Sequence, residues 1–279
     1  FDTAFLELPP EVIQLTMRVN QKYFACQDRE SGKLCSRFLF VSNIESSDPD
    51  AIIAGNQKVL AARLSDARFF WEQDLKLPLP EHKKKLDQIV FHEKLGTVAD
   101  KAERVARLAE WLVSERLIRA DFEAVGRAAR LAKADLVTEM VGEFPELQGV
   151  IGSYYARAQG QSAEVADAIR DHYLPARQGD EVPTAKVTAA VNIADRLDTL
   201  VSFFSIGEKP TGSGDPFSLR RAALGFLQIL TKSGLRLPLS DVLTQAAVLV
   251  VISRLGALSS VTFPDLLDKD GHEHEITAE

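Results

Sequence analysis

The spacing of apolar residues changes near Pro80, and this change constrains the fold more than any other feature of the sequence. Before it, the apolar runs 23–26 and 38–41 flank a turn signal at Ser31-Gly32 and predict two short strands. After it, apolar residues recur at about 3.6-residue spacing in nearly every segment, which is typical of amphipathic helices. The sequence therefore predicts a mainly α chain that begins with a partial α+β region.

Helix start signals divide the chain further. Thr97 and Asp100 resemble a capping box, in which side chains and backbone N–H groups at a helix start bond each other. Asp215 followed by Pro216 indicates an N-cap with proline at the first helical position. With the apolar periodicity, these signals predict helices over about 51–75 with Asp50 as N-cap, 121–141, 162–172 with Ser162 as N-cap, 184–204, 216–231 and 240–255.

We expect four regions along the chain. They are a partial α+β domain over 1–80, a helical domain over 81–207, a helical linker region over 208–260, and an acidic, mobile tail over 261–279. The first residue is Phe1 rather than Met, and we interpret the chain as a piece of a longer protein.

The charge is unevenly distributed. The formal net charge of −7 argues against a uniformly basic nucleic-acid binder, but the tail alone carries −5, which leaves −2 for the rest and permits a local basic face. No apolar run reaches the roughly 20 residues of a membrane span. Two cysteines, Cys26 and Cys35, in a chain of this length favour a reduced, cytoplasmic protein.

Two carboxylates lie on largely apolar helices, where an unpaired buried charge would be costly. Asp135 projects among Ala128 and Leu131, and Asp195 belongs to a polar stripe on an otherwise apolar helix. With His92 earlier in the chain, their order resembles that of the ligands in the HD metal-phosphohydrolase superfamily.

That superfamily is named for an adjacent His and Asp, and this chain has Ala134-Asp135 at that point. The region 81–207 is therefore expected to be a degenerate HD-like domain. We interpret His92, Asp135 and Asp195 as structural residues, and predict no bound metal and no catalytic residue in this chain.

Several strings resemble, in order and spacing, the β subunit of bacterial two-subunit glycyl-tRNA synthetase. They are NQKYF (20–24), FLFVSN (38–43), GNQKV (55–59), ARLSDA (62–67), FHEKLG (91–96), KADL (133–136), EFPELQG (143–149), DRLDTL (195–200), PTGSGDPF (210–217) and LRR (219–221). Gln57 and Arg196 depart slightly from the pattern, since the family usually has Glu and Lys there. The resemblance covers about residues 14–235, and from Val261 onward we find none.

The resemblance implies a central fragment of the β subunit of an α2β2 ligase that attaches glycine to its tRNA with ATP. In that family the α subunit carries the class II active site, where ATP and magnesium are expected. The β subunit contributes tRNA recognition. The expected partners are therefore glycine tRNA and the α subunit, with no membrane and no cofactor in this fragment.

Basic residues give candidate contacts to tRNA phosphates. They lie on three predicted helices: Arg104 and Arg107, then Arg127, Arg130 and Lys133, and finally Arg220 and Arg221 near a helix start that favours anions. The alternative is a solvated charged face. The glycine-containing turn 210–216 lacks the Gly-Lys-Ser/Thr ending of a nucleotide-binding phosphate loop. Tyr154 and Tyr155 could stack on an unpaired base or fill the core.

Two other functions remain open at this point. One is an HD-type phosphohydrolase that uses Asp135 and Asp195 as metal ligands. The other is a structural scaffold that contacts the α subunit without binding RNA.

Overall fold

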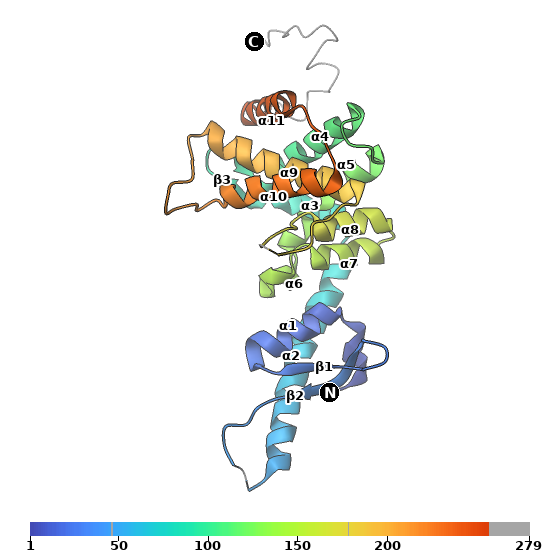
Figure 1. Cartoon of the computed structure of the whole chain (residues 1–279). Coiled ribbons are helices and arrows are strands. Elements are labelled where there is room, and N and C mark those ends of the chain that lie inside the picture. Colours follow the sequence, from blue (N-terminus) through green and yellow to red (C-terminus); the bar gives the residue numbers. More distant parts are fainter. Residues whose placement is uncertain (46, 178, 257–279) are drawn as a thin grey trace.

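The computed structural model describes residues 1–45, 47–177 and 179–256. Within these residues, strands form only a pair of two-stranded sheets, so the predicted mainly α class is confirmed (Figure 1). The prediction of an acidic, mobile tail over 261–279 lies outside the described residues. The four domain boundaries and the HD-like character of 81–207 stay predictions.

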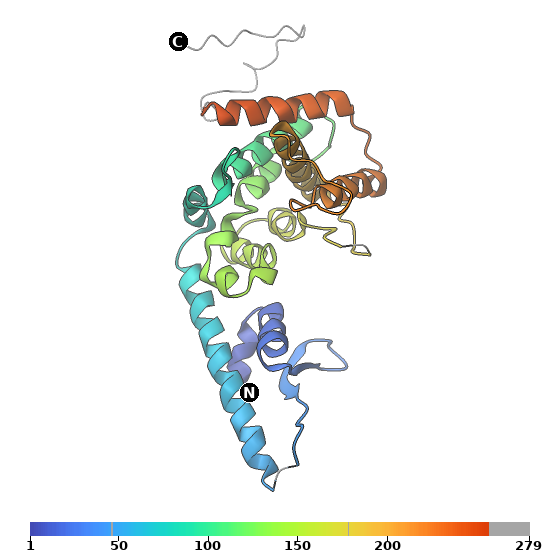
Figure 2. The same ribbon diagram turned by 90° about the vertical axis from the view of Figure 1, so that its left-hand side faces the viewer.

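The N-terminal part is a small mixed unit packed on a long helix. A 3-10 turn (Thr3–Glu7) and α1 (Pro10–Gln21) precede an antiparallel hairpin of β1 (Phe24–Gln27) and β2 (Leu34–Leu39). Helix α2 (Pro49–Leu75) packs against this unit and continues to the helical part above it (Figure 2). Its N-cap is Asp48, two residues before the predicted Asp50, because the Asp48 side chain accepts the N–H of Ala51.

Asp74, at the end of α2, joins the two parts of the molecule. Its buried carboxylate accepts the N–H groups of Glu139 (2.9 Å) and Met140 (3.0 Å) and the hydroxyl of Tyr155 (2.8 Å). Three donors satisfy a charge that burial would otherwise penalise. Tyr155 therefore belongs to the core, and Tyr154 donates to Glu11 of α1.

The helical part packs around one largely buried helix, α9 (Lys186–Ser205). Helix α9 packs against α4, α5, α8, α10 and α11. The helical part also contains, in chain order, α3 (Leu79–Lys84), a 3-10 turn (Lys85–Gln88), the hairpin of β3 (Val90–His92) and β4 (Gly96–Thr97), α4 (Val98–Ser114), α5 (Phe122–Leu131), α7 (Val150–Ala158), α8 (Ala163–Asp171), α10 (Leu219–Ser233) and α11 (Leu239–Arg254). Among the helices that the structure describes, none combines the length and apolar composition that a bilayer crossing requires.

The helix predicted over 121–141 is wrong in its second half. Helix α5 ends at Leu131, and a 3-10 turn (Ala134–Val137), α6 (Glu139–Glu143) and a further 3-10 turn (Pro145–Leu147) follow. Thr138 accepts the N–H of Val141, so its side chain starts a new helix instead of continuing the old one. The break changes the direction of every side chain after Leu131.

Other local signals had mixed outcomes. The capping box of Thr97 and Asp100 is present at the start of α4, as predicted. Helix α10 begins at Leu219 rather than at Pro216, because Ser218 takes a left-handed conformation. Asp215 nevertheless satisfies this helix start, since its carboxylate accepts the N–H groups of Leu219 (2.8 Å) and Arg220 (2.9 Å).

Candidate functional site

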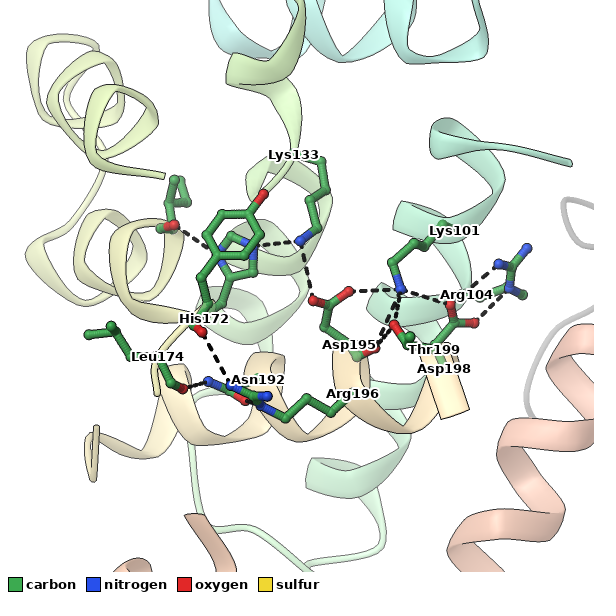
Figure 3. A network of polar contacts seen from close by, with 12 residues as sticks. Lys101, Arg104, Lys133, His172, Leu174, Asn192, Asp195, Arg196, Asp198 and Thr199 are labelled. Atoms are coloured by element: carbon green, nitrogen blue, oxygen red, sulfur yellow. Dashed lines mark hydrogen bonds and ion pairs between the residues drawn. The ribbon is translucent and has the colours of Figure 1, made fainter. Parts of the chain in front are cut away.

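The Asp195 carboxylate lies at the centre of a buried ionic network. Its oxygens meet two ammonium groups, with Lys101 Nζ at 2.9 Å from Oδ1 and Lys133 Nζ at 3.2 Å from Oδ2 (Figure 3). Both lysines and Asp195 are largely excluded from solvent. These two charges outweigh desolvation and hold the pKa of Asp195 well below its usual range.

Asp198, one turn along α9, extends the network toward α4. Lys101 Nζ lies 3.1 Å from its Oδ2, and Arg104 Nε donates to its Oδ1 at 2.6 Å. Arg104 also donates to the carbonyl of Leu95 at 3.2 Å and to Ser253 Oγ at 3.2 Å. The Arg104 side chain is 1% exposed, so it ties α4, α9 and α11 together inside the molecule.

His172 completes the other end of the network. Lys133 Nζ donates to His172 Nε2 at 2.8 Å, and the second ring nitrogen, Nδ1, lies 2.8 Å from the carbonyl of Ile169. Burial lowers the pKa of His172 to about 3, so the ring is neutral with its proton on Nδ1. The Lys133 ammonium also lies 3.9 Å from the centre of the Tyr173 ring.

Asp135 is fully buried, and its carboxylate accepts backbone N–H groups at the start of α7. Its Oδ2 accepts the N–H groups of Gly149 at 2.6 Å and Gly152 at 3.1 Å. Burial raises the pKa of Asp135 to about 6, against the opposing effect of these N–H groups. A side-chain carbon at Gly152 would lie 2.9 Å from the same carboxylate oxygen, so only glycine fits there without displacement.

The three positions of the HD-like pattern have different surroundings. His92 packs edge-on against the rings of Phe203 and Phe217, at centroid distances of 5.7 and 5.8 Å. Asp135 faces the α7 backbone, and Asp195 faces two lysines. The described residues hold no group of three or more His, Cys, Asp or Glu side chains placed to bind a metal. The prediction that no metal binds stays a prediction.

The structure places two of the predicted RNA contacts inside the molecule. Arg104 and Lys133 are 1% and 6% exposed, and both are bonded to buried carboxylates of α9. Sequence periodicity did not reveal these buried contacts, because the carboxylates belong to a helix more than 60 residues away in the chain. Neither side chain can reach a phosphate without breaking the network.

Two further candidates are partly neutralised. Arg107 pairs with Glu103 at 3.1 Å. Arg130 pairs with Glu103 at 3.4 Å and with Glu110 at 2.5 Å. The two arginines are partly exposed, but these carboxylates offset much of the positive charge that would otherwise attract a phosphate.

The remaining candidates are exposed. Arg220 and Arg221 line a cavity of about 600 Å³ beside the start of α10, and Arg177 lies on the same cavity. No sequence pattern had indicated Arg177, which lies between predicted helices. Within the described part of the chain, the side chains of Arg177 and Arg221 have no partner, and Arg220 donates only to the carbonyl of Thr211.

Arg127 lies apart from this cavity, on the exposed face of α5. It lines a smaller hollow of about 330 Å³ with Lys83 and the exposed ring of Phe122. Its guanidinium has no partner among the described residues. We refer to Arg127, Arg177, Arg220 and Arg221 as the interface arginines.

Comparison with known proteins identifies the family. The family model described as "Glycyl-tRNA synthetase beta subunit" matches residues 1–275. The chain belongs to this family. The match includes most of the stretch from Val261 onward, where the sequence motifs had shown no resemblance.

Curated members of the glycyl-tRNA synthetase β-subunit family are similar in sequence to most of this chain. The glycine–tRNA ligase beta subunit of Phenylobacterium zucineum (strain HLK1) is 50% identical over 99% of this chain and 40% of its own length. Those of Neisseria gonorrhoeae (strain NCCP11945) and Aromatoleum aromaticum are each 53% identical, over 84% and 88% of this chain and 34% and 35% of their own lengths. The chain therefore spans about 40% or less of these relatives.

Proposed function

We propose that this chain binds glycine tRNA and positions it for a separate α subunit, which attaches glycine with ATP and magnesium. The chain itself supplies no catalytic residue in this proposal. The curated relatives are named as beta subunits of a glycine–tRNA ligase, which fits a supporting role beside another subunit.

The single observation that carries the proposal is the unneutralised charge beside α10. Arg177, Arg220 and Arg221 line one cavity, and the only carboxylate among its described lining residues, Asp215, already accepts two backbone N–H groups. Free guanidinium groups are well suited to phosphate, because their N–H groups can bond two oxygens of one anion. A cavity with two such groups, Arg177 and Arg221, and with Arg220, which donates to a backbone carbonyl, favours the backbone of a nucleic acid.

The buried ionic network argues against the hydrolase alternative. In such an enzyme Asp195 would bind a metal ion, whereas here an ammonium group occupies each of its oxygens. Displacing Lys101 and Lys133 from Asp195 would leave the buried Lys133 without an ion-pair partner among the described residues and Lys101 with Asp198 alone, which is strongly unfavourable.

The scaffold alternative has one observation in its favour. Leu224 and Leu227 on α10 are 61% and 52% exposed, and Leu243 on α11 is also exposed. Exposed leucines can mark a protein contact. A contact with the α subunit through these leucines is compatible with RNA binding by the arginines, so both can operate in one complex.

Chemical protection of arginines tests the proposal directly. The chain would be treated with phenylglyoxal, an arginine-selective dicarbonyl reagent, with and without glycine tRNA, and modification would be read by peptide mass spectrometry. Arg177 and Arg221 should be modified in the free chain and protected by tRNA. Arg236, which is exposed and lies on none of these cavities, serves as the control and should stay reactive. Equal modification of Arg177 and Arg221 with and without tRNA would refute this placement of the RNA.

A further inference from the structure

A separate cavity of about 760 Å³ lies at the start of α9. It is bounded by the end of α4, the connection from α4 to α5, the first turns of α8, and residues 185–188. This volume is in the range of pockets that hold nucleotide-sized molecules. We call it the α9 cavity.

The backbone at the start of α9 presents unused donors to the α9 cavity. Among the residues that the structure describes, no side chain caps this helix, and its first turn holds no acidic residue. Within the described residues, no acceptor takes the N–H groups of Lys186, Val187 and Thr188, and all three residues line the cavity. Val187 and Thr188 are 5% and 1% exposed, whereas Lys186, the first residue of the helix, is exposed.

The Thr188 side chain is a second, independent indication of a ligand. The residue is only 1% exposed and lines the α9 cavity, yet its hydroxyl has no hydrogen-bond partner among the described residues. Buried hydroxyl groups in proteins are ordinarily bonded. A threonine hydroxyl beside free backbone N–H groups is a combination that suits an anionic oxygen.

The charged side chains around the α9 cavity have the sign that such a ligand needs. Arg116, Arg119 and Lys186 line it, and none has a partner in the described part of the chain. Three carboxylates also line it, but two are already bonded.

Of these carboxylates, Asp121 accepts the N–H of Ala124 at 2.7 Å and caps α5. Asp167 pairs with Arg157 at 2.6 Å and with Arg170 at 3.2 Å. Only Glu164 is unpaired within the described residues, against three unpaired cations. The backbone N–H does not cancel the charge of Asp121, so Asp121 and Glu164 together oppose three cations, and the surplus of charge at the α9 cavity is positive.

We propose that the α9 cavity binds a phosphate group, with its oxygens on the N–H groups of residues 186–188 and on the hydroxyl of Thr188. Lys186 and Arg119 supply the compensating charge. The apolar side chains of Val113 and Ile118 line the same cavity and offer a surface for a nucleobase. The shared chemistry is a nucleoside phosphate, and it can come from a free mononucleotide or from a nucleotide of an RNA chain.

Phosphate binding here does not depend on tRNA binding by the interface arginines, because the two sets share no residue. The test is an amide nitrogen–proton NMR titration of the chain with inorganic phosphate, AMP and a 5′-phosphorylated oligoribonucleotide. The signals of Val187 and Thr188 should shift on saturation with phosphate. Tighter binding of AMP would indicate a free nucleotide, and tighter binding of the oligoribonucleotide would indicate RNA.

Two variants distinguish phosphate binding at the α9 cavity from nonspecific attraction of phosphate by positive charge. Thr188→Val keeps the side-chain shape and removes the hydroxyl, and it should weaken phosphate binding by about tenfold, the effect expected for one hydrogen bond to a charged group. Arg119→Ala, at an exposed position, should also weaken binding, and it remains informative if Thr188→Val fails to fold. Arg236→Ala should bind phosphate like the wild type.

Absence of any shift at Val187 and Thr188 with all three probes would overturn the proposal. So would equal binding by the wild type, Arg119→Ala and a folded Thr188→Val. Loss of tRNA binding in variants of Arg177 and Arg221, with phosphate shifts retained, would show that the two sites act separately.

Discussion

The Lys133 ammonium bridges His172 Nε2, at 2.8 Å, and Asp195 Oδ2, at 3.2 Å, inside the helical part of the molecule. These groups come from three separate segments: the turn after α5, the end of α8, and α9. Because one buried cation satisfies both neighbours, the centre around Lys133 is held together by an ion pair and a hydrogen bond. Its stability should respond to single substitutions in predictable ways.

Asp195→Asn should destabilise the chain by about 3–5 kcal/mol, because it removes the negative charge between two buried ammonium groups. Lys101 keeps Asp198, whereas Lys133 loses its only ion-pair partner among the described residues. Urea unfolding followed by circular dichroism measures the change. Asp167→Asn, which removes a partly exposed carboxylate, is the matched control and should lower the free energy of unfolding by about 1 kcal/mol or less. Equal effects of the two substitutions would contradict this account.

Acid should destabilise the wild type through His172. Its folded pKa is about 3, below the unfolded value of about 6.5, so the unfolded state binds an extra proton as pH falls through about 6.5. This contribution amounts to about 1.4 kcal/mol per pH unit below about 6. Asp135 acts in the opposite direction, because its raised folded pKa of about 6 makes the folded state take up a proton between about 6 and 4.

His172→Gln separates these two effects. Glutamine can accept the Lys133 hydrogen bond but does not titrate, so the variant should gain stability relative to the wild type by about 1.4 kcal/mol per pH unit below about 6. Unfolding free energies at several pH values between about 7 and 5 give this difference. A difference that does not change with pH would mean that His172 is not held neutral in the folded protein.

Gly152→Ala should destabilise the chain by about 1–3 kcal/mol, because the added methyl group would lie 2.9 Å from both Asp135 Oδ2 and Ile169 Cγ2. Gly142→Ala is the matched control, since no atom of the described residues lies within 4 Å of the added methyl group there. It should be neutral or stabilising by up to about 1 kcal/mol. Thermal or urea unfolding measures the stability of both variants. A larger loss of stability in Gly142→Ala than in Gly152→Ala would contradict this prediction.

Local sequence signals predicted much of the secondary structure. The capping box at Thr97 depends on residues three positions apart, so it can be identified from the sequence alone. Helical periodicity likewise placed α8, α9 and α11 within about two residues, the usual uncertainty of helix ends.

The site was harder to predict because its contacts join distant segments. Sequence periodicity indicated that Asp135 and Asp195 face apolar neighbours, but not which groups meet them. Arg104 bonds Asp198, which lies 94 residues away in the chain, and Lys133 bonds Asp195, which lies 62 residues away. The helix end at Leu131 also turned Lys133 inward, where uninterrupted periodicity would have grouped it with Arg127 and Arg130.

The interface arginines give the most direct test of tRNA binding. Binding of glycine tRNA would be measured by fluorescence anisotropy at several salt concentrations, for the wild type and for the variant Arg127→Ala, Arg177→Ala, Arg220→Ala and Arg221→Ala combined. Arg29→Ala with Arg236→Ala, at exposed positions outside these cavities, is the matched control. Circular dichroism should show unchanged helical content in each, since none of these side chains is buried.

We expect weaker binding by the quadruple variant and a log–log salt dependence that is flatter by about 0.7–0.9 for each arginine–phosphate pair that the substitutions remove. The control should keep the affinity and salt slope of the wild type. A folded quadruple variant that matches the wild type in both affinity and salt slope would contradict the placement of tRNA on these arginines, and would favour a scaffold role for the chain.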